Sequence, residues 1–264
     1  MKKESALILS GGGALGLAHI GVLENLEKHY EFNYLAGVSA GAIVAAGYAC
    51  GMNSVQIKHA IDQTDIFSLA FDLSWKNSGI ISGDMILEKL SKIYGDRTFE
   101  DLKVPLTIGA TDFSTGERVN ITSGKIADAV RASLSIPVLF EPYVHADTDR
   151  YLVDGGLSQN FPLDLAIKEY EGPHIIGINV ANIKPLPEDF DTTKFFGRNQ
   201  DLFKSIQRTF RIFFQNQQTH FPEDPRVNLI EPDLSDYSSA TLSRAKFEEI
   251  IEIGKNTPLN LSHA

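Results

Sequence analysis

The chain has 264 residues, of which 43% are hydrophobic and 22% charged, and its 24 Lys and Arg against 34 Asp and Glu give a formal net charge of −10. This composition is typical of a globular protein and excludes a disordered, collagen-like or coiled-coil chain. The acidic balance argues against a dedicated nucleic-acid binder, because such proteins carry a clustered basic excess. The length allows a sizeable hydrophobic core, and we interpret residues 1–264 as a single domain.

The cysteine content and the apolar segments bear on the compartment. Cys50 is the only cysteine, so the fold must be stable without an intrachain disulfide, as reducing compartments require. Only a short apolar run precedes the first glycines, which is too short for a signal peptide. The most apolar stretch, residues 36–52, is interrupted by glycines and falls short of the ~20 apolar residues of a membrane span. We therefore expect a cytoplasmic protein.

The first part of the chain alternates short apolar runs with helical patterns. Residues 5–10 form an apolar strand that ends at three glycines, and residues 14–28 carry apolar side chains at helical spacing. A second strand is predicted over residues 34–38, and a helix of small and apolar residues over 40–50. The repeated unit is therefore a strand, a tight turn and a helix.

The rest of the chain continues this alternation. Two surface helices are predicted over residues 53–64 and 84–94, with a loop containing Trp75 between them. Further strands are predicted over residues 104–112, 118–122, 151–153, 174–181 and 226–231. Further helices are predicted over residues 125–133, 199–218 and 239–255, with a Pro- and Asp-rich loop over 183–197. Strands alternating with helices predict a three-layer α/β/α fold with a mostly parallel central sheet.

The glycine loop that follows the first strand matches a nucleotide-binding fingerprint. Gly11 to Gly16 read G-G-G-A-L-G, which fits G-x-G-x-x-G between a strand and a helix. That fingerprint also requires an acidic residue roughly 20 positions later, at the end of the next strand. Gly37-Val38-Ser39 stands there instead, and no P-loop lysine follows the glycines. We therefore favour another role for Gly11, Gly12 and Gly13, as an oxyanion hole of backbone N–H groups at a helix N-terminus.

The end of the second strand carries a candidate nucleophile. Gly37-Val38-Ser39-Ala40-Gly41 is a G-x-S-x-G pattern at a strand-to-helix turn, the context of a nucleophile elbow. A serine on such a sharp turn has a strained backbone and close neighbours. The positions two before and two after it therefore cannot carry bulky side chains.

A serine nucleophile needs a base. None of the histidines after Ser39, which are His59, His145, His174, His220 and His263, lies in an evident strand-end loop late in the chain. Asp154 instead ends a short predicted strand and is followed by Gly155-Gly156. Catalytic groups of parallel sheets collect at strand C-termini, so Asp154 is the predicted base. The alternative is a turn aspartate that bonds to its own loop.

Together these motifs resemble those of the patatin-like phospholipases. The likeness covers residues 5–180, with residues 199–255 as a C-terminal extension. Its matching parts are the glycine loop with Gly16, the elbow with Gly37 and Gly41, Asp154-Gly155-Gly156, Arg131-Ala132-Ser133 to Ile136-Pro137, and Asn160-Phe161-Pro162.

The resemblance implies a serine lipid acyl hydrolase, such as a phospholipase A, that uses a Ser-Asp dyad without histidine, metal or cofactor. By position, Ser39 would be the nucleophile, Asp154 the base, and the backbone N–H groups of Gly11 to Gly13 the oxyanion hole. Burial of Asp154 would raise the pKa of its carboxyl and make it a better proton acceptor. The substrate would be a lipid or another ester, with no nucleic acid as partner.

One position departs from the family pattern. Relatives usually carry Arg or Lys where this chain has Leu15, which leaves head-group preference and rate open, and Arg131 is the candidate to supply a charge nearby. Two other functions remain open. One is an acyltransferase, in which an alcohol, a thiol carrier or a lysolipid intercepts the acyl-enzyme. The other is a catalytically weak homologue that binds lipid or phosphate.

Residues 199–218 are a candidate for lipid contact. One face of the predicted helix is apolar, with Leu202, Phe203, Ile206, Phe210, Phe213 and Phe214. Residues 194–218 also contain Lys194, Arg198, Lys204, Arg208 and Arg211 against Asp201 alone. Such a helix could lie on an anionic interface or line an acyl channel, which predicts transient contact with the inner membrane face. The alternative is that the phenylalanines only cover the sheet.

Two further groups of residues are candidate sites. Phe67, Leu69, Phe71 and Trp75 are a second candidate acyl wall. His145, Asp147 and Asp149 lie in one polar stretch without the spacing that would direct them to a common metal. We interpret that stretch as a surface turn, and we expect no metal site.

Overall fold

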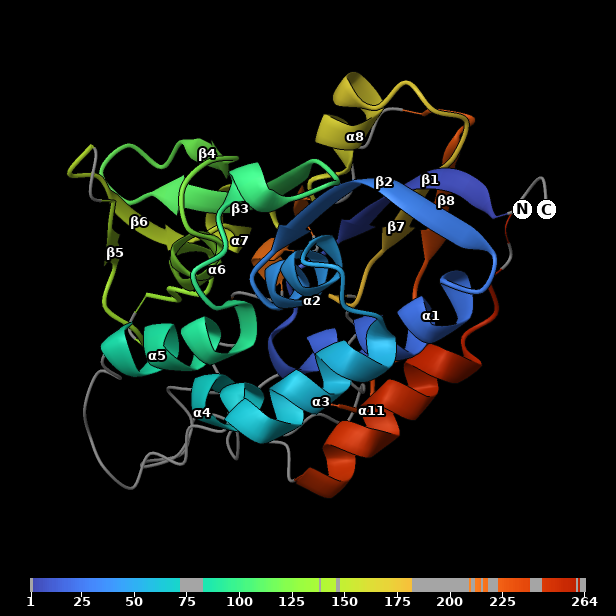
Figure 1. The fold of residues 1–264 in the computed structure, drawn as a ribbon, viewed down its shortest axis with the longest axis horizontal. Coiled ribbons are helices and arrows are strands. Elements are labelled where there is room, and N and C mark those ends of the chain that lie inside the picture. The colour runs from blue at the N-terminus through green and yellow to red at the C-terminus, as the bar shows by residue number, and fades with distance from the viewer. Residues whose placement is uncertain are drawn as a thin grey trace.

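The computed structural model describes residues 2–71, 83–137, 139–145, 148–181, 223–237 and 244–259, together with residues 209, 212–214, 216–217 and 261. A central sheet lies between helices on its two faces (Figure 1). Its strand order is β5-β6-β3-β2-β1-β7-β8, and β4 pairs with β3. The strands are β1 (Lys3–Leu9), β2 (Tyr30–Val38), β3 (Leu106–Asp112), β4 (Arg118–Ile121), β5 (Tyr143–Val144), β6 (Tyr151–Asp154), β7 (Ile175–Ile178) and β8 (Val227–Ile230).

The α-helices are α1 (Ala18–Leu26), α2 (Ala40–Ala49), α3 (Ser54–Thr64), α4 (Ile66–Phe71), α5 (Gly83–Tyr94), α6 (Ile126–Ser133), α7 (Gly156–Gln159), α8 (Leu163–Glu169) and α11 (Arg244–Asn256). Short 3-10 helices form at η1 (Gly13–Leu17) and η2 (Phe99–Asp101). Residues 209, 212–214 and 216–217 are helical as well, and we call them the late helical segment. None of the described helices is long and apolar enough to cross a membrane.

The predicted three-layer α/β fold is confirmed, with a sheet that is mixed. Strands β3, β2, β1, β7 and β8 run parallel to one another. Strands β4 and β6 pair antiparallel with β3, and β5 pairs antiparallel with β6. The antiparallel part contains the strand that ends at Asp154.

Side chains of alternate residues in β1 supply two separate cores, as strand geometry requires. Leu7 and Leu9 are fully buried in the larger core, which the helices below the sheet in Figure 1 cover. Ala6 and Ile8 are fully buried in the smaller core on the other face, beneath α8. Each fully buried Leu or Ile contributes about 1.5–3 kcal/mol relative to an exposed one. The four consecutive residues Ala6 to Leu9 are accordingly all apolar.

Several elements differ from the sequence prediction. Strand β2 begins at Tyr30, four residues earlier than predicted, and there buried and exposed residues alternate. The helix predicted from residue 14 begins as the 3-10 turn η1, whose first residue, Gly13, has a left-handed conformation (φ 59°). Helix α4 occupies part of the predicted loop, and β5, α7 and α8 were not predicted. Trp75, the loop at 183–197 and most of 199–218 lie outside the described residues.

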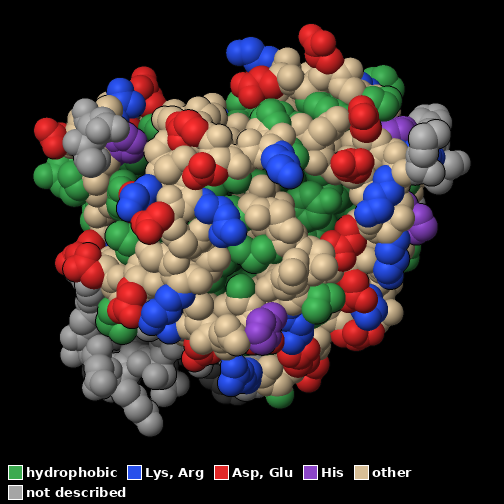
Figure 2. Space-filling view, viewed as in Figure 1, with side chains coloured by type: hydrophobic (Ala, Val, Ile, Leu, Met, Phe, Trp, Pro, Cys, Tyr) green, Lys and Arg blue, Asp and Glu red, His purple; other side chains and the backbone are tan. Residues whose placement is uncertain are grey.

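The surface carries charges of both signs. Figure 2 shows acidic and basic side chains interspersed over the face of the molecule that is also seen in Figure 1, rather than grouped by sign. Several acidic side chains are neutralised locally, for example Asp62 by Lys58 at 2.9 Å and Asp164 by Arg118 at 2.8 Å. Exposed pairs of this kind contribute little stability, about 0–1 kcal/mol each.

Candidate active site

Ser39 lies on a strained turn between β2 and α2. Its backbone angles are φ 52° and ψ −122°, a region that L-residues other than Gly rarely adopt, and only 4% of the residue is exposed. The close packing explains the flanking glycines. A Cβ on Gly37 would lie 2.6 Å from the carbonyl oxygen of Gly41, and a Cβ on Gly41 would lie 2.5 Å from that of Leu9. No side chain fits at either place.

A buried serine that the sequence did not single out holds the elbow. The backbone N–H of Ser39 donates to Ser133 Oγ at 2.8 Å, and Ser133 Oγ donates to the carbonyl of Gly109 at 2.6 Å. Ser133 is fully buried and is the last residue of α6. It therefore ties the nucleophile turn to the neighbouring strand β3. The sequence signal for Ser133 is the family-like stretch that begins at Arg131. A motif alone does not show that Ser133 accepts a hydrogen bond from the Ser39 N–H.

Asp154 reaches Ser39 by a different route from the one predicted. Strand β6 runs antiparallel to β3, so Asp154 does not end a parallel strand. It pairs with Ala110, while Val38, the residue before the nucleophile, pairs with Gly109. The two candidate catalytic residues therefore approach each other across one short stretch of β3. This antiparallel direction was not readable from a four-residue strand.

The Asp154 carboxyl is almost completely buried, with 3% of the residue exposed. Its Oδ1 accepts the Gly156 N–H at 2.8 Å, whereas Oδ2 is buried without a hydrogen-bond partner among the described residues. Burial raises the pKa of Asp154 from 3.8 to about 6, although the Ser39 hydroxyl and the Gly156 N–H both act to lower it. The Ser39 hydroxyl is thus close enough to act on the carboxyl, and Oδ2 is available to accept a proton.

The loop after β6 fits because Gly155 has no side chain. A Cβ there would collide with the carbonyl of Gly109, so the chain can turn into α7 directly over β3 only with glycine. Backbone bonds fix the position further. The Asp154 N–H donates to the carbonyl of Ser135 at 2.9 Å, and Thr111 Oγ1 donates to the Asp154 carbonyl at 3.0 Å.

The three glycines after β1 play different roles. The N–H of Gly11 donates to the carbonyl of Asn160 at 3.0 Å, so it is already used within the fold and is not an open donor. Gly12 and Gly13 are partly exposed at the start of η1, and their N–H groups make no backbone hydrogen bond in the described part of the chain. Ala40, at the first position of α2, adds an N–H that helix geometry leaves unpaired. The sequence prediction missed this last donor.

Two buried groups hold Ser10, the residue before the glycine loop. The Nε2 of His19 lies 2.9 Å from the carbonyl of Ser10, and the Val180 N–H donates to Ser10 Oγ at 3.0 Å. Burial lowers the pKa of His19 to about 4, so the ring is neutral near pH 7 and Nε2–H acts as the donor. His19 therefore fixes the glycine loop as a neutral hydrogen-bond donor.

Arg131 and Leu15 both have structural roles. The guanidinium of Arg131 is buried and donates to the carbonyls of Gly83 at 3.0 Å and Glu141 at 2.9 Å, and to the Ser135 hydroxyl. This charge clamps the start of α5 to the chain after α6, which argues against its proposed use as a replacement cation. Leu15 is 1% exposed and belongs to the larger core.

The remaining candidates are the second predicted acyl wall and the polar stretch predicted as a surface turn. Phe67 is buried in the larger core, and the side chains of Leu69 and Phe71 lie outside what the structure describes. The turn after β5 contains Asp149 in a left-handed conformation, and Asp147 lies outside the described residues. Within the described ranges, no group of three or more His, Cys, Asp or Glu side chains could hold a metal ion.

The late helical segment lies against the loop that carries Asp154. A Cβ on Gly156 would come within 2.7 Å of the Phe214 ring, so ring and backbone are in direct contact. Ile212 and Phe213 are 46% and 43% exposed. The cations of residues 194–211 lie outside the described residues.

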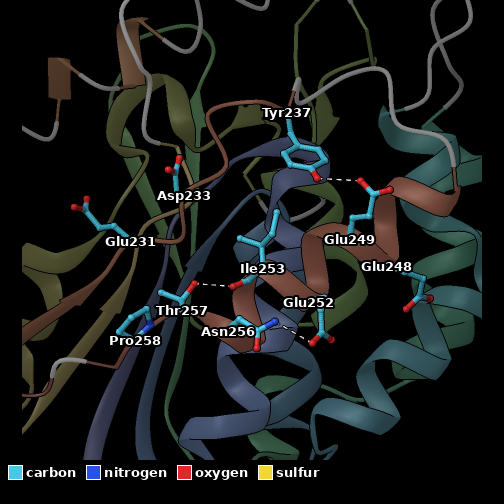
Figure 3. A pocket seen from close by; sticks show the side chains of 10 residues that line it. All are labelled: Glu231, Asp233, Tyr237, Glu248, Glu249, Glu252, Ile253, Asn256, Thr257 and Pro258. Carbon is cyan, nitrogen blue, oxygen red and sulfur yellow. Dashed lines mark hydrogen bonds between the residues drawn. The ribbon is translucent and has the colours of Figure 1, made fainter.

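A cleft of about 850 Å³ lies between the chain after β8 and helix α11 (Figure 3). Half of its lining residues are acidic: Glu231, Asp233, Glu248, Glu249 and Glu252. Tyr237 donates to Glu249 at 2.9 Å, and Asn256 donates to Glu252 at 3.0 Å (Figure 3). Neither Ser39 nor Asp154 lines this cleft, and its carboxylates would repel an anionic head group.

The sequence and the fold match known proteins. A family model described as patatin-like phospholipase matches residues 7–167. An NTE family protein of Mycobacterium tuberculosis is 36% identical over 162 residues, which cover 60% of this chain and 44% of that protein. Lysophospholipase NTE1 of Lodderomyces elongisporus is 25% identical over 269 residues, which cover 94% of this chain and 18% of that protein. The chain thus spans less than half the length of these two relatives.

The fold also resembles a solved structure. The crystal structure of VipD from Legionella pneumophila aligns with a TM-score of 0.59 and 15% identity, over 97% of this chain and 66% of that chain. At this identity the likeness concerns the fold alone.

Proposed function

The chain belongs to the patatin-like phospholipase family, and from that premise we propose that it hydrolyses carboxylic esters of lipids through an acyl-enzyme on Ser39. Asp154 is the proposed base. One observation carries the proposal: a strained, buried serine faces a carboxyl whose pKa is raised to about 6 and whose Oδ2 is unpartnered among the described residues. A general base works best when its pKa lies near the operating pH.

In the proposed acylation step, Ser39 Oγ attacks the ester carbonyl carbon while its proton passes to Oδ2 of Asp154. A C–O bond forms, and the carbonyl oxygen becomes an oxyanion that the N–H groups of Gly12 and Gly13 stabilise. Each such donor is typically worth ~10²–10³ in rate. When the intermediate collapses, the bond to the alcohol breaks and the alcohol takes the proton from Asp154.

In the proposed deacylation step, Asp154 removes a proton from water, and the resulting oxygen nucleophile attacks the acyl carbon. The ester bond to Ser39 breaks, the fatty acid leaves, and the proton returns to Ser39. Such general-base assistance contributes about 10²–10⁴-fold. Gly11 orders the loop in this scheme, because its N–H is bonded to Asn160.

The proposed substrate is a phospholipid or lysophospholipid met at a lipid surface. The lysophospholipase name of one relative supports this substrate class. The exposed side chains of Ile212 and Phe213, beside the loop of Asp154, support contact with acyl chains. Five cations against one acid in residues 194–218 favour an anionic surface, and we propose the inner membrane face as that surface.

The test is covalent labelling with a fluorophosphonate, together with turnover of a short p-nitrophenyl ester. We expect Ser39→Ala to abolish labelling, and Asp154→Asn to slow turnover at least about 100-fold. Ser114→Ala, at an exposed turn serine, is the matched control and should behave like the wild type. A folded wild-type protein that neither labels nor turns over the ester would refute the proposed hydrolase.

A further inference from the structure

One side chain of the late helical segment bonds to both ends of the short helix after Asp154. Gln217 Nε2 donates to the carbonyls of Gly156 at 3.1 Å and Leu157 at 3.2 Å. Its Oε1 accepts the backbone N–H of Asn160 at 2.8 Å. A single amide therefore spans α7 from its first residue to the residue that follows its last.

Helix α7 depends on such outside support. It has only four residues, Gly156 to Gln159, and a helix this short is not stable by itself. The last four carbonyls of a helix have no partner within it, and in a helix of four residues these are all of its carbonyls. Gln217 donates to two of them, those of Gly156 and Leu157. The Phe214 ring packs on Gly156 from the same segment.

The two ends of α7 lead to the two halves of the candidate site. At one end, the Gly156 N–H holds Oδ1 of Asp154 at 2.8 Å. At the other end, Asn160 accepts the Gly11 N–H at 3.0 Å and donates its Nδ2 to the Gly11 carbonyl at 3.3 Å. A Cβ on Gly11 would lie 3.2 Å from Ser39 Cβ, so this contact reaches the nucleophile.

The bonds therefore form a continuous path. It runs from the Asp154 carboxyl to Gly156, through Gln217 to Asn160, and on to the glycine loop beside Ser39. Asn160 is fully buried, whereas the three bonds of Gln217 are partly buried. Gln217 is the only member of the path that comes from outside residues 11–160.

We propose that Gln217 is a positioning residue, through which the late helical segment holds the Asp154 loop at a fixed distance from the glycine loop. This inference rests on the proposed function for its kinetic readout. Gln217 contacts no reacting atom and acts through Gly156 and Asn160. Contact of the neighbouring Ile212 and Phe213 with lipid would then order the base together with the surface that meets the substrate.

The test compares Gln217→Met, which keeps the length but loses all three bonds, with Gln217→Glu, which keeps an acceptor for Asn160 but loses the donors to Gly156 and Leu157. Asn256→Leu is the matched control, because this exposed amide on α11 bonds to Glu252 of its own helix. With a short soluble ester, we expect both Gln217 variants to lower kcat at least about tenfold and to leave KM within about twofold. The control should change neither.

A second readout does not depend on activity. We expect ¹³C NMR titration to show the pKa of Asp154 lower in Gln217→Met, because a loosened segment admits water and burial is the largest cause of the raised value. The new carboxylate of Gln217→Glu would itself raise that pKa, so only Gln217→Met is used for the titration. Wild-type kcat in both folded variants, together with an unchanged Asp154 titration in Gln217→Met, would overturn the inference. If the wild type itself is inactive, the proposed function fails and the titration alone decides. If Gln217→Met does not fold, the kinetics of Gln217→Glu carry the test.

Discussion

Replacing Asp154 with Asn should stabilise the protein at neutral pH while it removes the proposed base. The folded protein raises the pKa of this carboxyl from 3.8 to about 6, so between these values the folded state binds the proton more tightly than the unfolded state. Stability therefore falls as the pH rises through this window. A difference of about two pKa units corresponds to about 3 kcal/mol at pH 8. The variant keeps an oxygen for the Gly156 N–H and carries no charge.

The assay is urea unfolding of wild type and Asp154→Asn, followed by circular dichroism at pH 8 and at pH 4. We expect the variant to gain up to about 3 kcal/mol at pH 8 and much less at pH 4, where the wild-type carboxyl is mostly protonated. His19 titrates in both proteins, so its contribution cancels in the difference. A variant that gains nothing at pH 8, or gains equally at both pH values, would show that the carboxyl is not held uncharged by burial.

Three further predictions follow from the site. Ser133→Ala leaves the buried Ser39 N–H without its acceptor, which costs about 1–3 kcal/mol. Fluorophosphonate labelling of Ser39 should therefore slow, and Ser133→Thr should restore part of the labelling rate. Equal labelling rates in the wild type and both variants would contradict the role of Ser133. The proposed base acts only when deprotonated, so kcat/KM should rise with pH through a midpoint near 6, and a profile that is flat from pH 5 to 8 would exclude Asp154 as the base. Burial lowers the pKa of His19 from 6.5 to about 4, so protonation of this residue removes up to about 3 kcal/mol of stability as the pH falls through that range. In urea unfolding, His19→Gln should therefore lose less stability between pH 7 and pH 4 than the wild type. An equal loss of stability in both proteins would show that the pKa of His19 is not lowered.

The residues that sequence reasoning located are those whose signal is local. Three glycines, a serine between two glycines, and an aspartate before two glycines each mark a turn whose backbone leaves no room for a side chain. The structure brings Ser39 and Asp154 together and explains Gly37, Gly41 and Gly155 by close backbone contacts.

The missing parts depend on tertiary contacts. Ser133 and Gln217 have ordinary neighbours in the sequence, and only the folded chain brings them to the site, across 94 residues to Ser39 and 57 residues to Asn160. The direction of β6 was missed because four residues carry no signal for the orientation of their partner strand. The sequence predicts a free N–H donor at Gly11, because it does not show that the carbonyl of Asn160 already accepts this N–H.

Strand β3 sets the distance between the backbones of the two candidate catalytic residues. Val38 and Asp154 pair with the consecutive residues Gly109 and Ala110, and the spacing of hydrogen-bonded strands, about 4.8 Å, is among the most invariant lengths in proteins. The separation of the Ser39 and Asp154 backbones is thus set by the sheet, and side chains such as Ser133 hold the turn at its end. A change elsewhere on the surface that leaves β2, β3 and β6 paired therefore leaves this backbone separation unchanged.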